Sequence, residues 1–144
     1  MQRSRAQTRF KISTKSRLSV RDITSQVHAA VPENMTGMAT VFVEHTTAAV
    51  TVNECEKRLQ SDFETALDGV INNTGWQHDE LDGNADSHIR AMLIGASETI
   101  PIDSGELATG TWQSVLLIEC DGPRTRTVSV TITPVANDQS SSMT

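Results

Sequence analysis

Residues 109–135, TGTWQSVLLIECDGPRTRTVSVTITPV, decide the fold class of this chain. Valine, leucine, isoleucine and threonine dominate both sides of a short DGPR turn, a pattern that predicts two β-strands at 109–120 and 126–135. The connection between them is too short for a crossover helix, so antiparallel pairs are expected to dominate. The chain is therefore predicted to be rich in antiparallel β-structure.

Four more segments have the composition or the alternation of strands. They are residues 5–14, 38–45, 46–54 and 98–103. Pro101 favours an edge position for the last of them, because proline has no amide proton to donate to a neighbouring strand. Together with the two C-terminal strands, these segments account for most of the predicted regular structure.

One long helix interrupts the strands. The apolar residues of 55–71 recur every three or four positions, which is the pattern of an amphipathic helix. Asn53 and Glu56 resemble a capping box that would fix its start. Shorter helices are predicted at 22–31 and 89–95.

The order of these elements predicts an α+β, mainly β fold with one long central helix and one or two short helices. No repeat or second domain is visible. A single domain is therefore expected over residues 1–137. The polar tail 138–144 is expected to be disordered.

Composition limits the classes of partner. The net charge of −6 disfavours nucleic acid, because the phosphate backbone would be repelled. No apolar run reaches the roughly 18 residues that a membrane helix needs. The two cysteines, Cys55 and Cys120, are too few for a disulfide framework. Cys55 is expected to be buried, the alternative being a nucleophile whose pKa is lowered at the start of the helix, and Cys120 is expected to be buried and inert. A cytoplasmic location is expected.

Three histidines lie beside polar residues where strands end or loops run. His45 ends a predicted strand, while His78 and His88 belong to the polar loop 72–88. Three imidazoles with an open position describe a catalytic zinc-type site. Alternatively, His45 satisfies a strand end, and the other two histidines decorate a solvated loop.

Two further groups of residues are candidates for a site. Trp112 in the core would leave Thr111 and Gln113 facing a cleft, since neighbours on a strand point to opposite sides; simple strand packing is the alternative. The DGPR turn brings Asp121 and Arg124 together. Arg124 either pairs with Asp121 or offers its guanidinium to a phosphate or carboxylate.

The segments VEHTTAAVTVNE, DELDGNADSH and SETIPIDSGELATGTWQSVLLIECDGPRTRTVSV, in this order, resemble the YjbQ family over residues 5–135. The resemblance implies a compact β-sandwich-like fold with flanking helices, assembled as a homotrimer. It also implies a polar pocket. The positions that match the family motifs are His45, Thr46, Asn53, Glu54, His78, Asn84, His88, Gly110, Thr111, Trp112, Gln113, Asp121 and Arg124.

The resemblance further implies an activity similar to thiamine-phosphate synthase, which joins a pyrimidine pyrophosphate to a thiazole phosphate. In that scheme the three histidines would hold a divalent ion, zinc or magnesium, or transfer protons. Glu54 would orient an imidazole, Gln113 would contact substrate, and Arg124 would stabilise the leaving phosphates. Ligand-binding roles would fall to Thr46, Asn53, Asn84, Thr111 and Asp121.

Two other functions remain open at this point. One is a metal-assisted hydrolase that acts on another phosphorylated metabolite with the same histidines. The other is a non-catalytic trimer that binds a metal or a ligand, which the absence of a strong nucleophile favours. The sequence departs from its relatives at Asp86, where a histidine is frequent, and this puts a metal ligand at that position in doubt.

Overall fold

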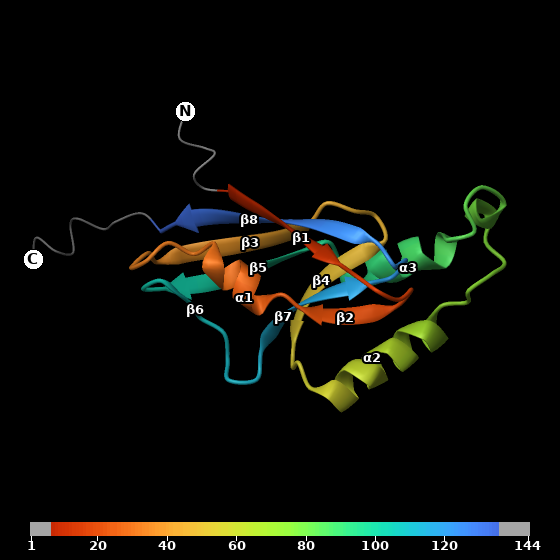
Figure 1. Cartoon of the computed structure of the whole chain (residues 1–144), viewed down its shortest axis with the longest axis horizontal. Coiled ribbons are helices and arrows are strands. Elements are labelled where there is room, and N and C mark those ends of the chain that lie inside the picture. Colours follow the sequence, from red (N-terminus) through yellow and green to blue (C-terminus); the bar gives the residue numbers. More distant parts are fainter. Residues whose placement is uncertain (1–6, 136–144) are drawn as a thin grey trace, which may run out of the picture.

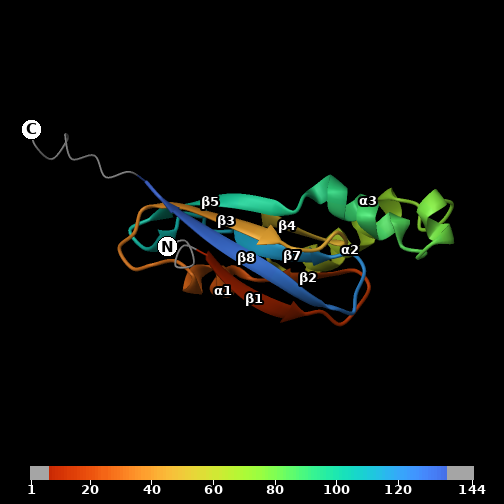
Figure 2. The same cartoon turned by 90° about the horizontal axis from the view of Figure 1, so that it is seen from above.

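The computed structural model describes residues 7–135, which form two antiparallel sheets packed face to face (Figures 1 and 2). The larger sheet has five strands and the smaller has three. The larger sheet runs in the order β1 (Gln7–Ser13), β8 (Thr125–Pro134), β3 (Gly37–Val43), β5 (Ser97–Asp103) and β6 (Glu106–Leu107). The smaller sheet runs in the order β2 (Ser19–Asp22), β7 (Ser114–Glu119) and β4 (Ala48–Asn53).

The main core fills the space between the sheets with aliphatic side chains. Val41 of β3 and Val130 of β8 face Val50 of β4 and Leu117 of β7, and all four are fully buried. Strand alternation explains this arrangement, because every second residue of each strand points inward. The predicted α+β, mainly antiparallel and sandwich-like fold is confirmed.

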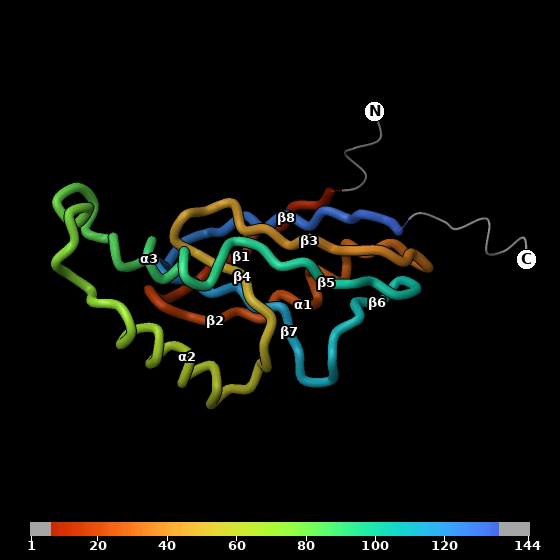
Figure 3. Tube along the Cα trace, turned by 180° about the vertical axis from the view of Figure 1, so that it is seen from behind, coloured from red at the N-terminus to blue at the C-terminus, as the bar shows by residue number. Residues whose placement is uncertain are grey.

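A second apolar cluster lies on the outer face of the three-stranded sheet, where α2 (Lys57–Val70) and α3 (Ala85–Ile94) cover it (Figures 1 and 3). Phe63 and Leu67 of α2 are only partly buried, and no residue of this helix is fully buried. The helix predicted at the centre of the chain therefore lies on the outside of the sandwich.

The ends of α2 differ from the sequence prediction. Glu56 is the N-cap, since its carboxylate accepts the amide protons of Arg58 and Leu59, and no capping box forms with Asn53. At the other end, the buried guanidinium of Arg90 from α3 donates to the carbonyls of Leu67, Asp68 and Ile71. Carbonyl groups in the last turn of a helix have no backbone amide donor within that helix. Arg90 supplies donors to them and so links the end of α2 to α3.

The polar segment after α2 is shorter than predicted. A short 3-10 helix, η2 (Gln77–Glu80), interrupts it, and α3 begins at Ala85 rather than at residue 89. His88 therefore lies on a helix. The remaining short helix is α1 (Thr24–Ala29).

The two C-terminal strands do not pair with each other, although the short turn between them suggested neighbours. β7 pairs with β2 and β4, whereas β8 pairs with β1 and β3, so the turn carries the chain from one sheet to the other. Gly122 makes this corner possible, because a Cβ atom there would lie 2.2 Å from the carbonyl oxygen of Ser16.

Three smaller predictions are also corrected. Residues 109–113 form no strand and project away from both sheets between β6 and β7 (Figure 3). The strands β2 and β6 were not predicted, and they are only four and two residues long. Pro101 does not lie on the outermost strand, since β5 pairs with β3 and with β6.

Among residues 7–135, no helix is long and apolar enough to cross a membrane. The tail predicted to be disordered, 138–144, and the predicted domain boundary at 137 lie outside the described residues.

Candidate functional site

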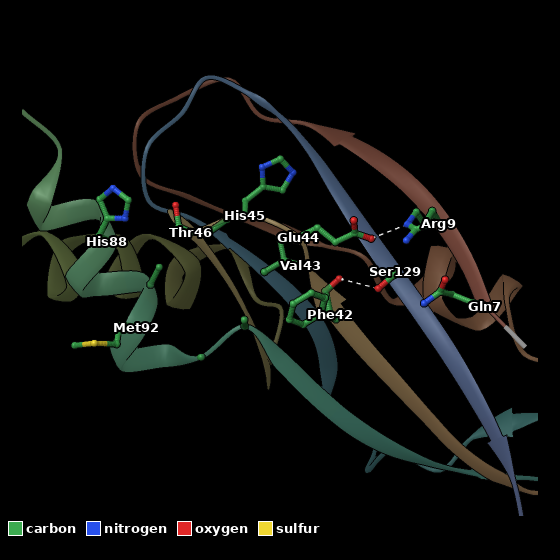
Figure 4. A pocket seen from close by; sticks show the side chains of 14 residues that line it. Gln7, Arg9, Phe42, Val43, Glu44, His45, Thr46, His88, Met92 and Ser129 are labelled. Carbon is green, nitrogen blue, oxygen red and sulfur yellow. Dashed lines mark hydrogen bonds and ion pairs between the residues drawn. The ribbon is translucent and has the colours of Figure 1, made fainter. Parts of the chain in front are cut away.

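A hollow lies at the end of the sandwich where β3 turns into β4, beside α3 (Figure 4). We call it the histidine hollow, because His45 from the β3–β4 turn and His88 from α3 both line it, on either side of Thr46. Two lobes of about 720 and 670 Å³ share these residues and Glu44.

The lobes differ in chemistry. The apolar lobe lies between α3 and the outer face of the five-stranded sheet, and Phe42, Ala91, Met92 and Ala96 contribute to its lining. The polar lobe lies toward the β7–β8 turn and is lined by Asp82, Asn84, Asp121, Arg124 and Arg126.

The ring of His45 is held in one tautomer. Its Nε2 accepts the backbone amide proton of Thr127 at 2.8 Å, so the single proton of the neutral ring resides on Nδ1. Burial, followed by the charge of Arg126, lowers the pKa of His45 below its usual value of 6.5. At neutral pH His45 is therefore an uncharged ring with a fixed Nδ1–H donor.

A buried ion pair lies beneath His45. Arg126 and Glu119 are 2% and 0% exposed, and the guanidinium donates to both carboxylate oxygens. Arg126 also donates to the carbonyl and hydroxyl of Thr47, while Glu119 accepts from the Thr14 hydroxyl and the Asp121 amide. The pair thus joins the β3–β4 turn to the β7–β8 turn, and so it sets the shape of the polar lobe.

Sequence reasoning missed Arg126 and Glu119, although one signal was present. Arg126 shares the inward side of β8 with Val128, Val130 and Ile132, so strand alternation alone indicates that it is buried. A buried arginine requires a carboxylate partner, which would have directed attention to Glu119.

Asp121 and Arg124 pair across their turn at 3.1 Å, as one of the two alternatives predicted. Asp121 also accepts from Nδ2 of Asn84 at 2.9 Å, which links the turn to the start of α3. The Arg124 side chain is 53% exposed, and it can therefore rotate toward a ligand. Oδ1 of Asn84 is buried without a partner among the described residues.

His78 does not line the histidine hollow. Its ring packs perpendicular to the ring of His88, with the two ring centroids 5.0 Å apart. His78 lines a separate hollow together with Trp76, Ile89 and His88. Its Nε2 is 3.6 Å from a carboxylate oxygen of Asp82. The structure therefore brings His45 and His88 into one hollow and leaves His78 on the other side of His88.

A metal ion bound by all three histidines does not fit this arrangement. Within residues 7–135, no group of three or more His, Cys, Asp or Glu side chains could hold a metal ion. In addition, Nε2 of His45 is occupied by the Thr127 amide. Asp86, the doubtful ligand, is buried and pairs with Arg90. Metal binding stays a prediction, and no chemical step below depends on it.

Four other predicted site residues lie at the opposite end of the β4–β7 pair. Asn53 pairs with Ser114 there, whereas Ala48, next to the hollow, pairs with Glu119. The five residue steps from Ala48 to Asn53 separate the two ends by about 17 Å. Asn53, Glu54, Thr111 and Gln113 consequently do not join the histidine hollow within one chain.

The expectations for Trp112 and the cysteines had mixed outcomes. Trp112 is 72% exposed and lies in a turn, so the prediction that it packs in the core is wrong. Cys120 is fully buried, as predicted, and burial raises its pKa to about 12. Cys55 is only partly buried, and burial followed by the charge of Asp22 raises its pKa as well. Neither thiol has the lowered pKa of a nucleophile.

The profile of the family described as UPF0047 protein YjbQ-like matches residues 8–135. The chain belongs to the YjbQ family. A UPF0047 protein of Archaeoglobus fulgidus is 43% identical over 83% of this chain and 94% of its own length. A UPF0047 protein of Methanothermobacter thermautotrophicus is 40% identical over 84% of this chain and 87% of its own length.

Solved structures agree with this assignment. A hypothetical protein from Aeropyrum pernix K1 has a TM-score of 0.85 at 39% identity, over 88% of this chain and 97% of that one. A YbjQ-like protein of unknown function from Sulfolobus solfataricus P2 has a TM-score of 0.81 at 34% identity, over 88% and 94%.

These comparisons overturn one expectation. The similar YjbQ-family proteins are named as UPF0047 proteins, and the solved structures are described as hypothetical or of unknown function. Nothing among them points to thiamine-phosphate synthase activity, and the prediction of that activity is wrong.

Proposed function

We propose that the histidine hollow binds a small molecule with a phosphate group. The observation that carries this proposal is the fixed tautomer of His45, which leaves Nδ1–H as a donor on a ring that lines the polar lobe together with the half-exposed Arg124. A neutral donor and a charged fork meet the needs of a phosphoryl group, which presents several acceptor oxygens. The hydroxyl of Thr46 lines both lobes and offers a third donor.

The three arginines that line the hollow are each already paired with a carboxylate, so an anionic ligand has to share or displace one of these ion pairs. Glu44 is paired with Arg9 at 2.7 Å, and Glu119 is paired with Arg126. Arg124 donates from Nε to the Asp121 carbonyl and from Nη2 to the Asp121 carboxylate. If Nη2 turns to a ligand, the carboxylate keeps its hydrogen bond from Asn84. A phosphate would thus share Arg124 with Asp121, whose carboxylate keeps a hydrogen-bond donor in Asn84.

We also propose a homo-oligomer, with the trimer that the family resemblance implies as its expected form. Its support is the outer face of the five-stranded sheet, where Met38 and Phe42 are 45% and 44% exposed. Thr40, Thr99 and Pro101 lie beside them on β3 and β5, so within residues 7–135 the middle of this face carries no charged side chain. The cytoplasmic location stays a prediction.

Titration with inorganic phosphate and with a panel of sugar, nucleoside and vitamin phosphates, followed by calorimetry, tests the proposal. Arg124→Ala should weaken binding of the best compound by about 10- to 100-fold, since a hydrogen bond to a charged group contributes about 1.5–3 kcal/mol. Arg58→Ala is the matched control, because Arg58 is an exposed arginine on α2 that also pairs with a carboxylate.

The Arg58→Ala protein should bind like the unmodified chain. Equal affinity in the Arg124→Ala and Arg58→Ala proteins, or no binding by any member of the panel, would refute the proposal.

A further inference from the structure

Two exposed apolar patches lie at opposite ends of the β-sandwich and differ in shape. One is concave, namely the apolar lobe of the histidine hollow, where Met92 is 71% and Phe42 is 44% exposed. The other is convex: Trp112, at 72% exposure, lies on the segment that projects between β6 and β7 (Figures 1 and 3). A tryptophan side chain buries roughly 150–250 Å² when it is covered, so leaving it in water forgoes a large stabilisation.

The turn that carries Trp112 is held in shape before any partner arrives. The side-chain oxygen of Gln113 accepts the amide proton of Gly110 at 2.8 Å, and the amide of Gln113 donates back to the Gly110 carbonyl at 3.1 Å. These two bonds close the turn on itself. Trp112 is therefore presented to solvent by an ordered turn, which lowers the entropy cost of docking it.

We infer that the turn 110–113 of a second copy of this chain docks on the histidine hollow and places Trp112 in the apolar lobe beside Met92. A thioether next to an indole ring is a favourable contact. Each chain would thus complete the ligand site of its neighbour. The inference rests on the proposed function only in treating the hollow as a ligand site.

Charge favours a second copy as the occupant. Two chains of net charge −6 repel each other overall, which favours contact between copies at surfaces without net charge. Residues 107–114 contain no charged side chain. At the apolar lobe, Arg9 and Glu44 neutralise each other in a 2.7 Å ion pair.

Position favours the same occupant. Phe42 belongs both to the apolar lobe and to the middle of the outer face of the five-stranded sheet, so a copy that covers this part of the face also reaches the hollow. The convex and concave patches are different surfaces of one chain. Their contact is therefore head-to-tail, and such contacts close into rings when the rotation permits.

Cross-linking in a Cys55→Ser background tests the docking, because the remaining Cys120 is fully buried. Thr111→Cys combined with Met92→Cys retains Trp112 and should give covalent multimers with a short bismaleimide. Thr111→Cys combined with Val70→Cys is the control, since Val70 is similarly exposed, at 64%, but lies on α2. A link within one chain leaves the protein at monomer mass on a denaturing gel, so multimer bands report links between chains.

Fluorescence provides a second measurement. Trp76→Phe leaves Trp112 as the sole tryptophan, and acrylamide quenching should rise severalfold when Met92→Glu is added, but not when Val70→Glu is added. Monomer bands alone, or quenching of Trp112 equal to that of free tryptophan in the Trp76→Phe protein, would overturn the inference. Neither readout uses phosphate, so a failure of phosphate binding leaves the outcome of this test intact.

Discussion

The backbone amide of Thr127 donates a hydrogen bond of 2.8 Å to Nε2 of His45, which fixes a side chain of the β3–β4 turn against β8. Protonation of the ring would remove the acceptor that this amide requires. Burial and the nearby guanidinium of Arg126 act in the same direction and lower the pKa of His45.

This hydrogen bond predicts a pH dependence of stability. The unfolded ring titrates near 6.5 and the folded ring titrates lower, so between these values the unfolded chain holds more protons. The free energy of unfolding should therefore decrease as the pH falls from 7 toward 5. His45→Gln should reduce this decrease, as measured by urea unfolding at both pH values. A His45→Gln protein with the same decrease as the unmodified chain would contradict the assignment.

The buried pair of Arg126 and Glu119 predicts a large effect of removing one partner. Arg126→Met should cost about 3–5 kcal/mol, because the carboxylate of Glu119 stays buried without its countercharge. The double variant Arg126→Met with Glu119→Gln should recover part of this loss in the same denaturant titration. A double variant no more stable than Arg126→Met alone would show that the charge is not the cause.

Substitution by alanine at Gly122 and at Gly69 should have opposite effects on stability. A Cβ atom at Gly122 would lie 2.2 Å from the Ser16 carbonyl, so Gly122→Ala should destabilise the protein by about 1–3 kcal/mol. Nothing lies within 4 Å of a Cβ atom at Gly69 on α2, and Gly69→Ala should stabilise by up to about 1 kcal/mol. Thermal unfolding measures both; shifts of the same sign would argue against the corner described at Gly122.

Arg90 predicts a local effect on the segment between α2 and α3. Arg90→Met leaves the carbonyls at the end of α2 without donors and removes a partner of the buried Asp86. Amide hydrogen exchange in residues 68–84 should accelerate at least tenfold, while the strands of the five-stranded sheet change less. Uniform acceleration across the chain would instead indicate a global loss of stability.

Zinc binding distinguishes a site within one chain from a site shared between chains. Because the Thr127 amide occupies Nε2 of His45, His45→Ala should change zinc affinity less than twofold. Equilibrium dialysis with metal analysis measures this affinity. Loss of one bound zinc per chain in each of His45→Ala, His78→Ala and His88→Ala would instead establish a three-histidine site assembled between subunits.

The strands were the most predictable part of the fold, because alternation of valine and threonine reports directly which side of a strand is buried. The same alternation does not state which sheet a strand joins. Nothing in the sequence of β7 and β8 distinguishes a hairpin from a corner, and the difference depends on contacts with Ser16 and on the pair formed by Arg126 and Glu119. Short β2 and β6 carry too few residues for a pattern.

The candidate site was predictable where the site lies next to strand ends in the sequence. His45, Asp121 and Arg124 follow strands that meet at one end of the sandwich, and the structure brings them together. Gln113 and Glu54 were grouped with them by resemblance, and the direction of β4 and β7 separates them within one chain. Sequence order alone does not indicate which end of a sheet a residue occupies.

The pairing of β1 with β8 has a consequence for synthesis of the chain. Gln7 lies opposite Thr131, so β1 cannot pair until β8 has been synthesised more than a hundred residues later. At about 5–20 residues per second, a ribosome leaves β1 unpaired for several seconds. Contacts this distant in sequence also slow the search for the native state. During that interval Phe10 and Ile12 have no folded core to pack against, and an unpaired apolar strand of this kind favours aggregation of the nascent chain.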